Sequence, residues 1–128
     1  MRLLLDTHTV LWFLEGNPRL SRTARDLIED LSNERLFSAA GAWEIAIKVS
    51  LGKLELHVPY ERLVPGQLLA NGIALLPLLP EHLTGVLALP FHHRDPFDRM
   101  LVAQAFAEEA VLVSADPVLD AYGVRRVW

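Results

Sequence analysis

Four acidic residues occupy positions from which their carboxylates could converge on one site. Asp6 and Asp116 each follow an apolar segment typical of a buried strand, and Glu44 and Asp98 each fall in the first turns of a predicted helix. Converging carboxylates bind hard cations such as Mg²⁺ or Mn²⁺. Ions of this kind lower the pKa of a bound water and stabilise charge on the oxygens of a phosphodiester. The pattern therefore predicts metal-assisted hydrolysis.

Local structure offers competing explanations for some of these acids. Asp95 and Asp116 each precede a proline, as a helix N-cap residue does. Glu44 can pair with Lys48 at i+4, which is worth about 0.3 to 0.5 kcal/mol on a helix surface. Asp6 ends a predicted core strand, and no cap accounts for it. A shared metal site explains all four acids, whereas capping leaves Asp6 unexplained.

The elements that must position these acids alternate along the chain. The apolar pattern predicts strands at 2–5, 35–38, 73–78, 111–115 and 124–128, and helices at 21–33, 39–52, 60–72 with a break near Pro65, 80–89 and 97–109. Alternation of this kind predicts a three-layer α/β/α fold with a mostly parallel five-stranded sheet, as one domain over residues 1–128. Sites in such folds lie beyond the carboxyl ends of the strands, where the strand order reverses.

Composition narrows the class of protein. The chain has 128 residues, of which 52% are hydrophobic, and a net charge of −4. An acidic balance argues against a broad basic surface for nucleic acid, although metal ions held by the acids would reverse the local sign and attract phosphate. The absence of cysteine excludes thiolate metal sites and is consistent with a reducing cytoplasm.

The N-terminal segment 1–16 is apolar but is interrupted by Asp6 and His8, so we expect no signal peptide. No segment is uninterruptedly apolar over the roughly 18 residues of a membrane span. We expect a cytoplasmic protein that is not inserted in a membrane.

The histidines do not show the spacing of a zinc site. Adjacent residues in a loop seldom point together, so the neighbouring pair at 92–93 is not expected to bind a metal jointly. We expect surface or loop positions for all five: His8, His57, His82, His92 and His93.

Four motifs, in order, resemble those of PIN-domain ribonucleases, specifically the VapC-type toxins of toxin–antitoxin pairs. They are LLLDTHTVLWFL, AAGAWEIAIKVSLGKLEL, HHRDPFDRMLVAQA and LVSADPVLDAYGV, and the resemblance runs from Arg2 to Trp128. It implies that the catalytic, metal-binding quartet is Asp6, Glu44, Asp98 and Asp116. It adds Asp95 as a further acid near the metal, and Ser114 as a supporting hydroxyl beside the last acid.

The same resemblance implies an Mg²⁺-dependent endoribonuclease that cuts tRNA or rRNA and inhibits translation. It also implies a homodimer neutralised by a cognate VapB-type antitoxin, whose C-terminal segment enters the groove and often places an Arg in the acidic pocket. In such pairs the antitoxin binds promoter DNA, so this chain would meet DNA only indirectly.

Two kinds of contact residue follow as hypotheses. Arg94, Arg99 and Lys48 flank the acids and could hold RNA phosphates, although Lys48 could serve only as the partner of Glu44. Segments 11–16 and 43–56 are candidate antitoxin contacts, and alanine changes at Trp12 and Trp43 test them.

Two other functions remain open. One is a catalytically inactive PIN-like binding module, against which the presence of all four acids argues. The other is a receiver-like phosphoacceptor domain, which needs an Asp after the third strand and a Lys after the fifth. This chain has Glu81 after the predicted third strand, and its last lysine is Lys53. Metal-dependent RNA cleavage abolished by Asp6→Asn would separate the nuclease from both.

Overall fold

A parallel sheet forms the centre of the molecule. The computed structural model describes residues 1–128, with strands β1 (Arg2–Leu5), β2 (Glu34–Ser38), β3 (Ile73–Leu76), β4 (Val111–Val113) and β5 (Arg126–Val127). Their order in the sheet is β3-β2-β1-β4-β5, and every neighbouring pair is parallel. The predicted five-stranded α/β fold is confirmed. The order differs from the 2-1-3-4-5 order of receiver domains, so the receiver-like alternative is wrong.

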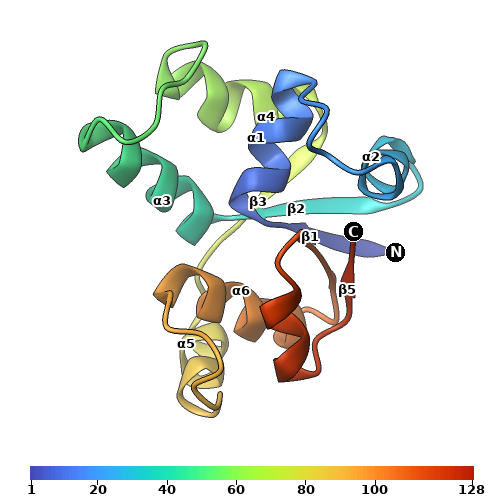
Figure 1. Ribbon diagram of the computed structural model, residues 1–128, viewed down its shortest axis with the longest axis vertical. Coiled ribbons are helices and arrows are strands. Elements are labelled where there is room, and N and C mark those ends of the chain that lie inside the picture. Colours follow the sequence, from blue (N-terminus) through green and yellow to red (C-terminus); the bar gives the residue numbers. More distant parts are fainter.

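Helices cover both faces of the sheet (Figure 1). One side carries α1 (Thr7–Glu15), α2 (Arg22–Glu29), α3 (Ala39–Ser50), the irregular turn η1 (Arg62–Gln67) and α4 (Leu68–Ala70). The other side carries α5 (Pro80–Leu87), α6 (Pro96–Ala107) and the 3₁₀ helix η2 (Pro117–Tyr122). None of these helices combines the length and the apolar character needed to cross a membrane.

The alternation of side chains along β1 builds two cores. Leu3 and Leu5 face the α1–α4 side and pack in a cluster with Phe37 and Ile45, whereas Leu4 faces α6 in a second cluster. All three leucines are fully buried. A strand buried on both faces reads as a continuous apolar run, which is why RLLL shows no polar alternation.

Several elements end earlier than predicted. The helix predicted at 21–33 ends at Glu29, because Asp30 accepts hydrogen bonds from the backbone and hydroxyl of Ser32 and forms a turn. The strand predicted at 73–78 ends at Leu76, because Pro77 has no N–H to donate to the ladder. The last strand, predicted over 124–128, is reduced to β5.

Two helical segments depart from a simple periodic pattern. The break expected near Pro65 is present, since Val64 has the non-helical angles φ −123 and ψ 109 that the residue before a proline favours. Helix α1 had no predicted bounds, because its apolar residues surround the helix and hide the helical period.

Candidate active site

The site lies where the carboxyl ends of β1 and β4 meet, at the reversal of strand order. The backbone N–H of Asp6 donates to the carbonyl of Val113 at 3.1 Å, and the Thr9 hydroxyl donates to the same carbonyl at 3.0 Å. Directly after β4, the Ser114 hydroxyl accepts from the backbone N–H of Asp116 at 3.2 Å. These bonds place Asp6 and Asp116 at the same edge of the sheet.

Both of these acids also cap helices. Oδ1 of Asp6 accepts from the backbone N–H of Thr9 at 2.8 Å, and Oδ1 of Asp116 accepts from that of Val118 at 3.0 Å. The expectation that capping cannot explain Asp6 is therefore wrong, because α1 begins at the next residue. In each case the cap uses only one carboxylate oxygen, and Oδ2 stays available to the site.

Glu44 is held by two neighbours in the second turn of α3. Its Oε1 accepts from the hydroxyl of Thr7 at 2.6 Å, and its Oε2 receives the Lys48 ammonium at 2.9 Å. Thr7 and Glu44 are both buried. The i+4 pairing of Glu44 with Lys48 is confirmed, and the bond from Thr7 ties the first residue of α1 to α3.

Asp95 and Asp98 begin α6. Asp95 is the N-cap, since its Oδ1 accepts from the backbone N–H of Phe97 at 2.8 Å and of Asp98 at 3.3 Å. The cap predicted for Asp95 is confirmed. Asp98 sits in the first turn with 29% of its side chain exposed.

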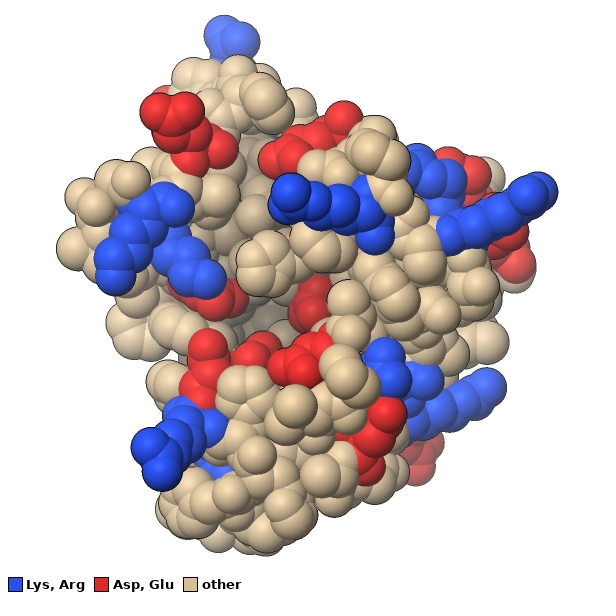
Figure 2. All heavy atoms as spheres, in the orientation of Figure 1, with Lys and Arg blue, Asp and Glu red and all other residues tan.

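The electrostatics of Asp98 show that the acids act on one another. Its pKa is raised from 3.8 to about 6, chiefly by burial and then by the negative charge of Asp95. The charges of Glu44 and Asp6 raise this pKa further, and His93 opposes them. Acidic side chains surround a hollow on this face of the molecule (Figure 2). The structure thus gathers Asp6, Glu44, Asp95 and Asp98.

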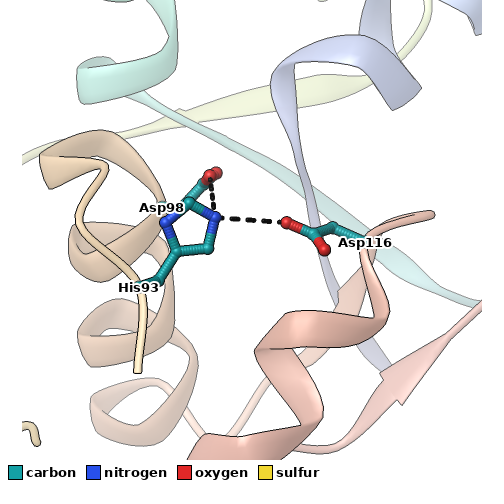
Figure 3. Close-up of side chains that lie close together, drawn as sticks. All are labelled: His93, Asp98 and Asp116. Carbon is teal, nitrogen blue, oxygen red and sulfur yellow. Dashed lines mark hydrogen bonds and ion pairs between the residues drawn. The ribbon is translucent and has the colours of Figure 1, made fainter. Parts of the chain in front are cut away.

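His93 joins Asp116 to this group and is the residue that the sequence analysis missed. Its Nε2 lies 3.2 Å from Oδ2 of Asp98 and 3.3 Å from Oδ2 of Asp116 (Figure 3). His93 lies in a loop, as expected, but its contacts with these two acids were not predicted. The only signal available was its position five residues before Asp98, in the loop that leads into α6.

The other histidines behave differently. His92 turns its ring edge-on to Tyr122, with centroids 5.1 Å apart, so the pair at 92–93 does not point to one place, as expected. His82 is fully buried, and its Nε2 lies 3.0 Å from Glu108. The prediction of a surface or loop position for His82 is therefore wrong. The buried ring is held in place by the backbone N–H of Leu79, which donates to Nδ1 at the start of α5.

The donor set suits a hard divalent ion. One donor atom each from His93, Asp98 and Asp116 lies within 4.8 Å of the others. Oδ2 of Asp6 and Oδ1 of Asp98 accept no hydrogen bond from the protein. Carboxylate oxygens dominate, which fits Mg²⁺ or Mn²⁺ better than zinc.

The three basic residues predicted to flank the acids differ in their exposure to solvent and in their hydrogen-bond partners. Arg94 is exposed and Lys48 is half-buried against Glu44. Arg99 is only 6% exposed, and its guanidinium donates to the carbonyls of Pro90 at 2.8 Å and Val86 at 3.3 Å. The prediction that Arg99 contacts RNA is wrong, because its donors face the interior.

Known proteins resemble this chain in sequence and in fold. Ribonuclease VapC16 of Mycobacterium tuberculosis is 40% identical over 70 residues, which are 52% of this chain and 48% of that relative's own length. The chain thus matches about half of the length of this curated relative. The fold resembles that of VapBC2 from Rickettsia felis bound to a promoter DNA fragment (TM-score 0.72, 15% identity, 99% of this chain and 98% of that chain).

It also resembles VapBC-1 from nontypeable Haemophilus influenzae (TM-score 0.67, 16% identity, 99% of this chain and 97% of that chain). The sequence model of the PIN domain family matches residues 3–124. With that match across nearly all of its length, the chain belongs to the PIN domain family.

Proposed function

We propose that this protein is a metal-dependent endoribonuclease whose ion is held by Asp6, Glu44, Asp98 and Asp116. The observation that carries the proposal is the environment of Asp98, a half-buried carboxylate surrounded by the negative charges of Asp95, Glu44 and Asp6. Like charges this close repel one another, and a divalent cation relieves the repulsion. Mg²⁺ is the proposed ion, with Mn²⁺ as its substitute.

The bound ion would supply an activated water and stabilise charge on the phosphate. The chain's own residues would hold and orient it. Thr7 and Lys48 fix both oxygens of Glu44, and the Ser114 hydroxyl fixes the turn that carries Asp116. Asp95 stays the helix cap and adds negative charge. Arg94, exposed beside the site, would hold an RNA phosphate, and Lys48 would do so from the other side.

The names of the similar proteins support a toxin role. One relative is a ribonuclease named VapC16, and the structural neighbours are VapBC complexes. We propose that this chain is the toxin of such a pair, that it cuts tRNA or rRNA and inhibits translation, and that a VapB-type antitoxin neutralises it. Its RNA substrates are met in the cytoplasm, where we place its action. DNA would be reached only through the antitoxin.

A small, mostly apolar pocket supports the proposed antitoxin contact. It lies beside α1 and is lined by Leu11 and Leu14 of segment 11–16, by Leu56 at the end of segment 43–56, and by Val58 just beyond that segment. Trp43, which is 61% exposed, adds apolar surface on α3. Alanine at Trp12 and at Trp43 should each weaken capture of a co-expressed VapB-type antitoxin. Folded variants that bind it as well as the wild type does would exclude this surface.

The test of the nuclease is cleavage of total cellular RNA by the purified protein with Mg²⁺ or Mn²⁺, in parallel with EDTA. Discrete fragments should appear with metal and disappear with EDTA and in Asp98→Asn. Asp26→Asn is the matched control, because Asp26 is an exposed acid of α2 paired only with Arg22. Metal binding without cleavage by the folded protein would favour the inactive binding module.

A further inference from the structure

The ring of His93 is fixed at both of its nitrogens. Nδ1 lies 3.0 Å from the backbone nitrogen of Asp95, and Nε2 lies between Oδ2 of Asp98 and Oδ2 of Asp116. The backbone N–H of His93 donates to the hydroxyl of Tyr122 at 2.8 Å. The imidazole therefore cannot turn without breaking several contacts.

These contacts assign the tautomer. A backbone N–H can only donate, so Nδ1 of His93 must accept the bond from Asp95 and carry no hydrogen. In the neutral ring the hydrogen is then on Nε2, the atom that faces the two carboxylates (Figure 3). A metal-bound histidine has the opposite arrangement, because it ligates with one nitrogen and donates from the other. His93 is close enough to be a ligand, but its hydrogen bonds oppose that role.

We propose that His93 is a positioning residue that links the two acids, because its Nε2–H donates to Oδ2 of Asp116 while Nε2 lies 3.2 Å from Oδ2 of Asp98, and that its ring takes the place of a second metal ion between them. The centre would then hold one ion. This inference rests on the proposed metal-dependent function and goes beyond it, since the acidic quartet alone does not fix the number of ions.

The carboxylate oxygens that His93 does not contact are consistent with a centre that holds one ion. Oδ2 of Asp6 and Oδ1 of Asp98 accept no hydrogen bond from the protein and are available to a cation, whereas Oδ2 of Asp98 and Oδ2 of Asp116 face His93. A second ion between Oδ2 of Asp98 and Oδ2 of Asp116 would have to displace the imidazole. Displacement would also leave the backbone N–H of Asp95 without its acceptor.

The first experiment reads the tautomer without any metal. Protein labelled with ¹⁵N in its histidines is measured in EDTA by long-range ¹H–¹⁵N correlation, with His93→Gln used to assign the signal. We expect the Nε2–H form for His93. The Nδ1–H form would overturn the bridge, whether or not the protein is a nuclease.

The second experiment counts ions by Mn²⁺ titration with EPR detection. Asn at position 93 can still accept from Asp95 but cannot reach the carboxylates, whereas Gln can supply an N–H near the position of Nε2. We expect one Mn²⁺ in the wild type and in His93→Gln. In His93→Asn a second Mn²⁺ should bind at least about tenfold more tightly than in the wild type, the scale on which outer partners of metal ligands change affinity.

Results that would overturn the one-ion centre differ from the result that would overturn the metal-dependent function. Nitrogen coupling between Mn²⁺ and His93, two tight ions in the wild type, or an unchanged count in His93→Asn would each overturn the one-ion centre. A folded wild type that binds no Mn²⁺ would overturn the proposed metal-dependent function and the ion count with it. The tautomer measurement would still decide whether His93 bridges the two acids.

Discussion

At the scale of single residues, three acids of the site use one carboxylate oxygen to cap a helix and leave the other oxygen for the site. Oδ1 of Asp6, Asp95 and Asp116 each accepts a backbone N–H at a helix start. Their other oxygens are left for a cation or for His93. Capping and metal binding are therefore compatible roles, because a carboxylate offers about four lone-pair positions.

Asp98 gives a pH-dependent prediction. Its pKa in the folded, metal-free protein is raised from 3.8 to about 6, so over that interval the folded state holds more protons than the unfolded state and stability falls as pH rises. In EDTA, Asp98→Asn should raise the free energy of unfolding by about 1 to 2 kcal/mol at pH 7, less than the full shift implies because the side chain is partly exposed.

At about pH 4 this gain should be much smaller, because Asp98 is then protonated in the folded state and already about half protonated in the unfolded state. Urea denaturation at the two pH values measures the difference. An equal effect at both would show that the charge of Asp98 is not the cause. Saturating Mn²⁺ should reverse the order, since only the wild type keeps the ligand and is stabilised by the ion.

At the scale of elements, Arg99 fastens α6 to the loop that precedes it. Its guanidinium donates to the carbonyls of Pro90 and Val86 and lies 4.2 Å from the ring centroid of Phe91. Arg99→Ala should lower the free energy of unfolding by about 2 to 3 kcal/mol, because the part-buried carbonyls of Pro90 and Val86 lose a charged donor.

Arg94→Ala is the matched comparison. Arg94 is exposed, so its removal should change stability by no more than about 0.5 kcal/mol while weakening RNA binding. Thermal unfolding and RNA gel shifts on both variants separate the two roles. A stable Arg99→Ala protein that no longer binds RNA would reverse this assignment.

Gly41 lets α3 approach the end of β2. A Cβ added there would lie 2.6 Å from Cε1 of Phe37 and 3.2 Å from the hydroxyl oxygen of Thr7, which holds Glu44. Gly41→Ala should destabilise the protein by about 1 to 3 kcal/mol through overpacking, and should lower RNA cleavage by moving Thr7.

Gly66→Ala serves as its control, since the nearest atom to an added Cβ is the Glu61 carbonyl oxygen at 3.5 Å. This change should be nearly neutral in both assays. Equal stability of the two variants would mean that the Phe37 ring has room to move.

At the scale of the whole molecule, an apolar groove between α3, α5 and α6 is the surface we propose for the homodimer. Trp43, Leu83, Phe97 and Met100 line it, and Trp43 packs edge-on against Phe97 with centroids 5.6 Å apart. Buried aromatic side chains at the centre of an interface carry much of its binding energy.

Leu83→Glu, which leaves the proposed antitoxin contacts unchanged, should therefore weaken self-association at least about tenfold, measured by sedimentation velocity. Leu31→Glu is the control, because Leu31 is 82% exposed in the turn between α2 and β2. A wild type that stays monomeric, or two variants that behave alike, would remove this groove as the dimer surface.

Features that depend on neighbours along the chain could be predicted from the sequence. The Asp95–Pro96 start of α6, the pairing of Glu44 with Lys48 and the alternation of strands with helices were all predicted from local spacing, and the structure confirms them. Such features follow from backbone geometry and short-range contacts, which a sequence pattern records directly.

Contacts between side chains at the edge of the sheet could not be predicted in this way, because they depend on the packing of distant segments. His93 contacts Asp116 over 23 residues of sequence, and Arg99 turns its donors into the loop before α6 instead of toward the acids. These outcomes depend on the strand order and on the direction of each side chain in its loop. Spacing along the chain does not encode either, because both are set by packing between segments distant in sequence.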